Sequence, residues 1–291
     1  MALRGKPIRV AFLNVVATPH PAGVYERLFR FIANKPVKFW GTENAAIGPI
    51  RSRPENPGIF TGHVRTWVDI DPKSPAVQKR DLEEVPLTQE QREMSRELGF
   101  NGKTFRFVLD TNEHRVSIAT VNEVGHKLAP TRALSIFEKL LSPEVLGKDA
   151  EEVAVSIVPS DDALKRVLSI KRLDRVEIQI RRPNADDVTQ ETHEVLAELR
   201  AQNAKRQEVV LIRAAHTESL ELSETNQKYA RVAASGDGYV KSQGRNSAGE
   251  PEKRSTREYP KLVEKLVEEG QTFLGALAEI ARSARTRRAQ R

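Results

Sequence analysis

The sequence predicts an α+β protein with a mainly antiparallel sheet, and three short patterns within residues 151–187 carry this prediction. Residues 153–158 read VAVSIV, in which alternate apolar side chains share one face as they do in a strand. Ser160 then begins a short helix, because a serine followed by two acids supplies an N-cap and favourable charge for the first turn. Residues 175–180, RVEIQI, alternate polar and apolar side chains, which indicates a second strand with one buried face.

These three elements form a strand–helix–strand unit that ends at Arg182-Pro183-Asn184 and is typical of half a ferredoxin-like sandwich. Apolar periodicity defines further elements before this unit. In order, they are strand 8–16, helix 20–34, strand 37–41, strand 58–71, helix 88–98 capped by Thr88, hairpin 105–121 and helix 131–141. The order predicts an N-terminal α+β domain over residues 1–184.

Residues 185–291 are predicted to form a helix-rich C-terminal region that contains one β-hairpin. Its expected elements are helix 187–206, strand 208–214, helix 223–235, a polar and basic hairpin at 238–256, and a long helix at 259–285. Apolar residues recur along the long helix at Leu262, Leu266, Phe273, Leu277 and Ile280. We therefore expect a homodimer that forms through this apolar seam. The last ten residues, RSARTRRAQR, contain five arginines and no acid.

The composition limits the chemistry that the chain can perform. Its 291 residues include no cysteine, which excludes disulfides, thiolate metal sites, iron–sulfur clusters and thiol nucleophiles. No apolar stretch has the length of a membrane span, and the apolar run near the N-terminus is not typical of a signal peptide. We expect a soluble, cytoplasmic protein without membrane contact. The net charge of +7 favours a polyanionic partner such as nucleic acid.

Clustered basic residues give the strongest functional signal in the sequence. One cluster lies on or beside strand 175–180 and comprises Lys171, Arg172, Arg175, Arg181 and Arg182; the other lies in the 238–256 hairpin or directly after it and comprises Lys241, Arg245, Lys253, Arg254 and Arg257. Clustered guanidinium groups match phosphate geometry and release counterions on binding. Acids such as Glu177 and Glu252 interleave with them, so a solvated surface of mixed charge is the alternative. We predict that these ten residues bind nucleic acid, with DNA favoured over RNA.

No motif identifies a catalytic residue, a metal site or a cofactor. The six histidines are dispersed and show no zinc-hydrolase spacing, and no glycine-rich nucleotide loop is present. Asp69 and Asp71, at the end of strand 58–71, could serve a metal-dependent nuclease, although aspartates that begin a turn are far more common. Phe105 and Phe107 lie two residues apart, which is typical of side chains that face a core.

Two stretches resemble known proteins. They are IQIRRPNADD at 178–187, with the strand–helix unit before it, and GDGYVKSQGRNSAGEPEKRSTREYP at 236–260. Together they resemble a bacterial family defined by a domain of unknown function and met in phage-defence contexts. The same two stretches are loosely similar to the DNA-binding subunit of the Kiwa system and to the RexA exclusion protein of phage lambda. The resemblance implies an oligomeric DNA-binding sensor or effector without a hydrolytic site, and it assigns no functional residue.

Three functional hypotheses follow from the sequence. The first is a non-enzymatic, DNA-binding sensor or effector in bacterial defence against phage. The second is a metal-dependent nuclease that uses Asp69 and Asp71. The third is a protein-interaction module whose apolar helix seam docks a partner, while its basic charge serves only solubility.

Overall fold

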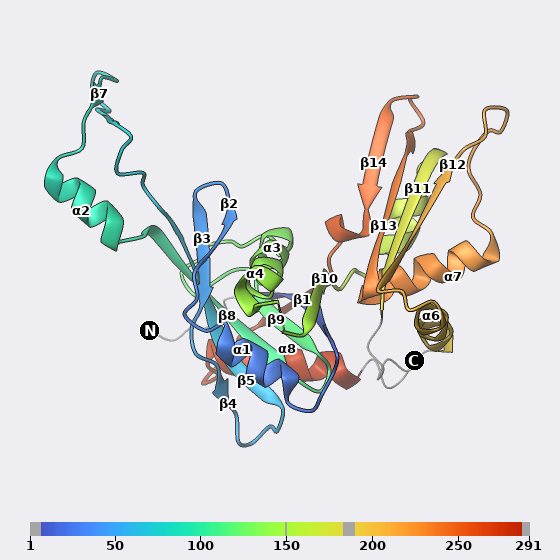
Figure 1. Cartoon of the computed structure of the whole chain (residues 1–291), viewed down its shortest axis with the longest axis horizontal. Helices are drawn as coiled ribbons and strands as arrows, with labels where there is room; N and C mark the ends of the chain where they lie inside the picture. Colours follow the sequence, from blue (N-terminus) through green and yellow to red (C-terminus); the bar gives the residue numbers. More distant parts are fainter. Residues whose placement is uncertain (1–6, 149, 183–189, 287–291) are drawn as a thin grey trace.

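A computed structural model describes residues 7–148, 150–182 and 190–286 of the chain. Within these ranges, helices and antiparallel strands build two large sheets that lie side by side, and an arm with a small two-stranded sheet projects from the first (Figure 1). The predicted α+β class with mainly antiparallel pairing is therefore confirmed. None of the helices in these ranges has both the length and the apolar character needed to cross a bilayer.

The first sheet is organised around the long strand β1, whose pattern of buried residues is nearly continuous. Its main path follows the order β10-β1-β9-β8-β5-β3-β2, while β15 pairs with β1 and β4 pairs with β5. The strands are β1 (Pro7–Thr18), β2 (Val37–Trp40), β3 (Glu43–Ile47), β4 (Arg51–Ser52), β5 (Ile59–Val68), β8 (Phe100–Asp110), β9 (Arg115–Ala119), β10 (Glu152–Ile157) and β15 (Leu262–Leu266).

Helices cover both faces of the first sheet. One face packs against α1 (Val24–Phe31), α3 (Pro130–Leu140) and α4 (Pro143–Leu146), and the other packs against α8 (Phe273–Thr286). Phe105 and Phe107 are both buried in the first of these cores, as the sequence predicts. The two cores together bury strands on both sides, which explains why β1 lacks simple polar alternation.

The second sheet has the strand order β12-β11-β13-β14. Its strands are β11 (Arg172–Arg181), β12 (Arg206–Ile212), β13 (Gly238–Arg245) and β14 (Pro251–Ser255). Val176, Ile178 and Ile180 of β11 pack on one face against α5 (Ala163–Leu168), α6 (Gln190–Ala201) and α7 (Glu224–Val232). A π-helical turn, η1 (Ala233–Asp237), follows α7, and a 3-10 turn, η2 (Thr256–Glu258), follows β14.

The arm spans residues 69–99 and extends away from the first sheet (Figure 1). It holds the short pair β6 (Ala76–Val77) and β7 (Glu84–Val85) and helix α2 (Gln89–Glu97). Thr88 caps α2 through a capping box with Gln91, as the sequence predicts.

The prediction of one long C-terminal helix over residues 259–285 is wrong. Residues Leu262–Leu266 form β15 and pair with Pro7–Ala11 of β1, and only Phe273–Thr286 are helical. The free edge of β1 offers backbone partners that no local pattern reveals, and Gly270 separates the two elements with a φ of +78°. Phe273, Leu277 and Ile280 of α8 lie in the chain's own core, whereas Leu262 and Leu266 of β15 are exposed, so the continuous helical seam expected to form a homodimer does not exist.

The strand–helix–strand unit forms, but its two strands belong to different sheets. β10 pairs with β1, whereas β11 pairs with β12 and β13. Alternation of apolar residues specifies which face of a strand is buried, and it does not specify the neighbouring strand. The predicted domain boundary, residue 184, lies outside the described residues; β11 precedes it, and β15 returns to the first sheet after it.

Candidate nucleic-acid interface

The second sheet has an outer face opposite its helices, and basic side chains from several strands meet there. Successive side chains of a strand alternate between faces, and paired residues of antiparallel strands share a face. Because Val176 and Ile178 face the helices, Arg175 and Glu177 face outward. Arg175 is in register with Gln243 of β13, which is in register with Lys253 of β14.

Seven of the ten predicted basic residues lie on or beside this face. We call it the basic face and define it by Arg172, Arg175 and Arg181 of β11, Lys241 and Arg245 of β13, Lys253 of β14, and Arg257 of η2. The Arg257 guanidinium lies 4.3 Å from the ring centroid of Tyr239 on the same face.

The other three predicted residues lie elsewhere. Arg254 is on the opposite side of β14, where its Nη1 donates to the Arg166 carbonyl at 2.6 Å and to Ser169 Oγ at 2.7 Å. Arg182 follows β11 and donates to the Ala204 carbonyl at 3.4 Å. Lys171 is exposed one residue before β11 begins. Arg254 and Arg182 are half-buried, and each donates to a backbone carbonyl, so both are structural contacts.

Carboxylates compensate the β11 side of the basic face. Glu177 lies 3.5 Å from Lys241 and 4.0 Å from Arg175, and it accepts a hydrogen bond from the Tyr239 hydroxyl at 2.9 Å. That hydrogen bond lowers the pKa of Glu177, and Lys241 and Arg175 lower it further, so the group is ionised at neutral pH. A single carboxylate is thus shared between two cations.

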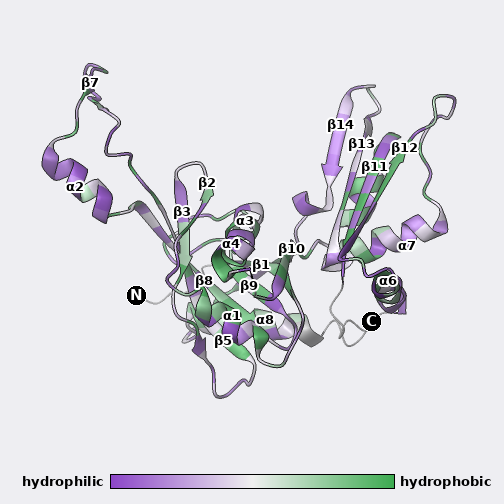
Figure 2. Ribbon diagram, in the orientation of Figure 1, coloured by the Kyte–Doolittle hydropathy of each residue, from purple (hydrophilic) through white to green (hydrophobic). Residues whose placement is uncertain are grey.

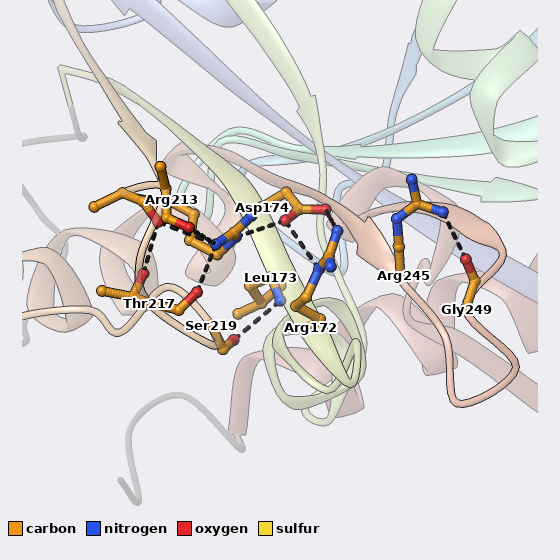
Figure 3. Close-up of polar contacts among 10 residues, drawn as sticks. Arg172, Leu173, Asp174, Arg213, Thr217, Ser219, Arg245 and Gly249 are labelled. Carbon is orange, nitrogen blue, oxygen red and sulfur yellow. Dashed lines mark hydrogen bonds and ion pairs between the residues drawn. The ribbon is translucent and has the colours of Figure 1, made fainter.

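A second carboxylate, Asp174, lies at the far end of β11 in a bulge of the ladder (Figure 3). It is 3.2 Å from Arg172 and 2.8 Å from Arg213, and the hydrogen bond from Arg213 lowers its pKa. Arg213 also donates to the carbonyls of the loop that follows β12, such as that of Ala214 at 3.0 Å. Arg213 therefore fixes this loop and is not a free surface cation.

The positive charge without a carboxylate partner is concentrated on the β13–β14 hairpin. Arg245 is exposed, and its Nη1 donates to the Gly249 carbonyl at 2.7 Å across the hairpin turn (Figure 3). Lys253 is exposed, and within the described ranges no ion pair involves it. These two residues are the cations on the basic face most available to an incoming phosphate.

The opposite end of the basic face is closed by the first sheet. Arg181 is largely buried and donates to the Val155 carbonyl of β10 at 3.0 Å. Burial lowers the pKa of Arg181, and it raises the pKa of Glu138 of α3, although Arg257 and Arg181 oppose the shift of Glu138. Arg181, Arg257 and Glu138 thus join the two sheets, and Arg181 is not available to a partner.

Sequence reasoning missed one cation of the basic face. Arg206 of β12 is in register with Arg181 and lies 3.2 Å from Glu208. The predicted strand began after it, at residue 208, so its face could not be assigned. The alternation of β12 would have placed it with Glu208, had the strand been extended by two residues.

Asp69 and Asp71 do not converge on a metal site. Asp69 accepts hydrogen bonds from Asn44 Nδ2 at 2.7 Å and from Trp67 Nε1 at 3.0 Å. Asp71 begins a turn and accepts from the Lys73 amide at 2.9 Å, which lowers its pKa. Both line a cavity of about 550 Å³ at the base of the arm. In the described part of the chain, no three His, Asp or Glu side chains gather as metal ligands would.

A family model described as a domain of unknown function, DUF4747, matches residues 6–282, nearly the whole chain. No curated protein matches the chain.

Proposed function

The chain belongs to the DUF4747 family, whose function is unknown, and we propose that it is a non-enzymatic nucleic-acid-binding protein. The basic face holds the phosphate backbone in this proposal. The observation that carries it is the meeting of cations from β11, β13 and β14 on one face, although β11 lies far from the β13–β14 hairpin in the sequence. Neighbouring strands are about 4.8 Å apart, so these side chains lie within one patch, in which Glu177 and Asp174 offset part of the charge.

Duplex DNA is the favoured ligand because the basic face offers charge and no stacking platform. Proteins that hold single strands stack bases on exposed aromatic rings. Tyr239 is the aromatic residue of this face, and it is only 7% exposed, beneath Lys241 and Arg257. Its hydroxyl is also engaged by Glu177. A surface of this kind contacts phosphates, and phosphate contacts give affinity with little sequence preference.

The direct test is a binding titration of the full chain against duplex DNA, single-stranded DNA and RNA of equal length at two salt concentrations. We expect the tightest binding to duplex DNA and a steep loss of affinity with salt. Absence of binding at low salt would contradict the proposal. Removal of residues 287–291, which lie outside the described ranges, tells whether the arginine-rich tail or the folded surface makes the contact.

A pair of variants tests the basic face itself. Arg245→Gln with Lys253→Gln removes two charges from the hairpin, and Lys73→Gln with Lys79→Gln removes two charges from the arm as a matched control. We expect the first pair to reduce the salt slope by about 2, because each lost phosphate contact removes about 0.9. The control pair should leave the slope unchanged. Equal effects of both pairs would show that only net charge matters.

The proposal extends to a role as sensor or effector in bacterial defence against phage. The resemblance of residues 178–187 and 236–260 to proteins of phage-defence systems supports this extension. Expression of the chain should reduce phage plating on a sensitive host, and the Arg245→Gln/Lys253→Gln variant should not. Equal protection by the unmodified chain and the variant would show that the defence role does not depend on the basic face.

The two alternatives have less support. A nuclease would need Asp69 and Asp71 to be free for metal ions, and both accept hydrogen bonds from their own surroundings. Incubation of the unmodified chain with DNA and Mg²⁺ tests the nuclease, and DNA that stays intact would exclude this activity. If cleavage occurs, Asp71→Ala should abolish it. The interaction module would need the apolar seam of α8, which is buried against the first sheet.

A further inference from the structure

Strand β12 forms one edge of the second sheet, and its outer backbone groups have no partner among the described residues. The Arg182 amide donates to the Lys205 carbonyl, and the Arg213 amide donates to the Asp174 carbonyl. The odd-numbered residues of β12 therefore direct their backbone N–H and C=O groups toward β11. Hydrogen-bonding direction alternates along an antiparallel strand. Even-numbered residues therefore direct their N–H and C=O groups away from the sheet; they are Arg206, Glu208, Val210 and Ile212. No backbone hydrogen bond from the described ranges reaches them.

The opposite edge of the same sheet is protected. The Asn246 amide donates to the Glu250 carbonyl, which places residues 251, 253 and 255 of β14 on the outer edge. Pro251 has no N–H to donate, and the Ser255 amide already donates to Glu258 at 3.3 Å. Proline and charge are the usual means of blocking an edge strand. β12 has no proline, and within the described ranges no cap covers its amides. Its charged residues, Arg206 and Glu208, lie in its first half, so Val210 and Ile212 leave the second half without charge.

The β12 edge also exposes apolar side chains. Val210 is 44% exposed and Ile212 is 68% exposed. Figure 2 shows β12 as largely hydrophobic and β14 as hydrophilic. Exposed apolar residues on an unprotected edge indicate a site where another strand adds to the sheet.

We propose that β12 pairs with β12 of a second copy of this chain, antiparallel about a twofold axis at Val210. A twofold interface needs a surface that complements itself, and the outward N–H and C=O groups of one strand complement those of its copy. This register places Val210 against Val210 of the second copy and Glu208 against Ile212 of the second copy. A register centred on Val209 would bring the two Glu208 side chains together diagonally, which like charge disfavours.

The pairing makes one continuous eight-stranded sheet from the two four-stranded sheets. The outward amides of Glu208, Val210 and Ile212 each gain a carbonyl partner in this sheet, and the exposed apolar side chains of the two strands contact each other. Dimerisation is measured without nucleic acid, so its failure would leave the proposed binding function untouched.

The first experiment is the mass of the full chain in solution as a function of concentration, with two variants. Val210→Pro removes an amide that β11 does not use, so the fold tolerates it and the two hydrogen bonds at the axis are lost. We expect at least a tenfold weaker dimer, while Val210→Thr, which keeps the amide, should dimerise like the unmodified chain. A monomer at all concentrations, or equal dimers in both variants, would overturn the proposal.

Two further variants test the register and do not depend on how proline is tolerated. Ile212→Glu should weaken the dimer because it faces Glu208 of the second copy, and adding Glu208→Lys should restore it. Because the chain has no cysteine, Val210→Cys places one thiol per copy at the axis. Cα atoms in such a pair lie about 5.5 Å apart, within disulfide range. Oxidation should yield a covalent dimer, and failure to do so in a dimeric sample would exclude this register.

Discussion

Replacing Glu177 by glutamine should strengthen nucleic-acid binding, which is the opposite of what most surface variants do. Glu177 neutralises Lys241 and Arg175, and it accepts a hydrogen bond from Tyr239. Glutamine keeps an oxygen for Tyr239 and removes the charge, so the basic face gains one net positive charge. If that charge releases one further counterion, the salt slope becomes steeper by about 0.9 and the affinity at 0.1 M salt rises about eightfold.

The assay is a fluorescence titration with a duplex at four salt concentrations, run in parallel with Glu84→Gln on the arm. Glu84 is exposed and remote from the basic face, so the same change of net charge should have little effect there. A melting curve of each variant checks that the fold is intact. Unchanged or weaker binding of Glu177→Gln, with an unchanged slope, would refute the assignment of the basic face as the interface.

Three further predictions concern stability. Burial raises the pKa of Glu138 above its ordinary value of 4.5. The contribution of Glu138 to the free energy of unfolding is therefore full below pH 4.5 and is lost as pH rises through the raised pKa. In Glu138→Gln the free energy of unfolding should fall less between pH 4 and pH 8, as denaturant unfolding curves at the two pH values would show. Phe107→Ala should cost about 3–5 kcal/mol in the free energy of unfolding, because the ring is fully buried and packs edge-on against Phe137 at 5.7 Å; denaturant titration measures this. Thr88→Ala should remove about 1 kcal/mol from helix α2 by opening its capping box, visible as faster amide exchange confined to the arm.

Local patterns predicted most of the secondary structure because the forces that set it act over a few residues. The alternation at Val176, Ile178 and Ile180 and the cap at Thr88 are of this kind, and both elements formed where expected. The strand at Leu262–Leu266 was missed because its pairing partner lies more than 250 residues earlier, on the edge of β1. Sheet partnership depends on such distant contacts, which no window of sequence contains.

The candidate interface was predicted in part for the same reason. Alternation placed Arg175 on an outward face, and the hairpin placed Lys253 and Arg245 near each other, but only the pairing of β11 with β13 brings them together. The prediction that Arg254 belongs to the basic face is wrong because Arg254 follows Lys253 directly, and successive side chains of a strand point to opposite faces. Arg181 lies on the predicted face, but its guanidinium donates to the Val155 carbonyl of β10, and no residue pattern predicts this contact.

The return of β15 to the edge of β1 has a consequence for how a nascent chain acquires its structure. Strands β11 to β14 occupy residues 172–255 without interruption, so this sheet can assemble while later residues are still being made. The first sheet is synthesised earlier and finishes later, because its last strand and the helix that seals one of its cores come from residues 262–286. Until then Ile8, Val10 and Phe12 lack their apolar cover, and ribosome-associated chaperones have their best opportunity to bind in that interval.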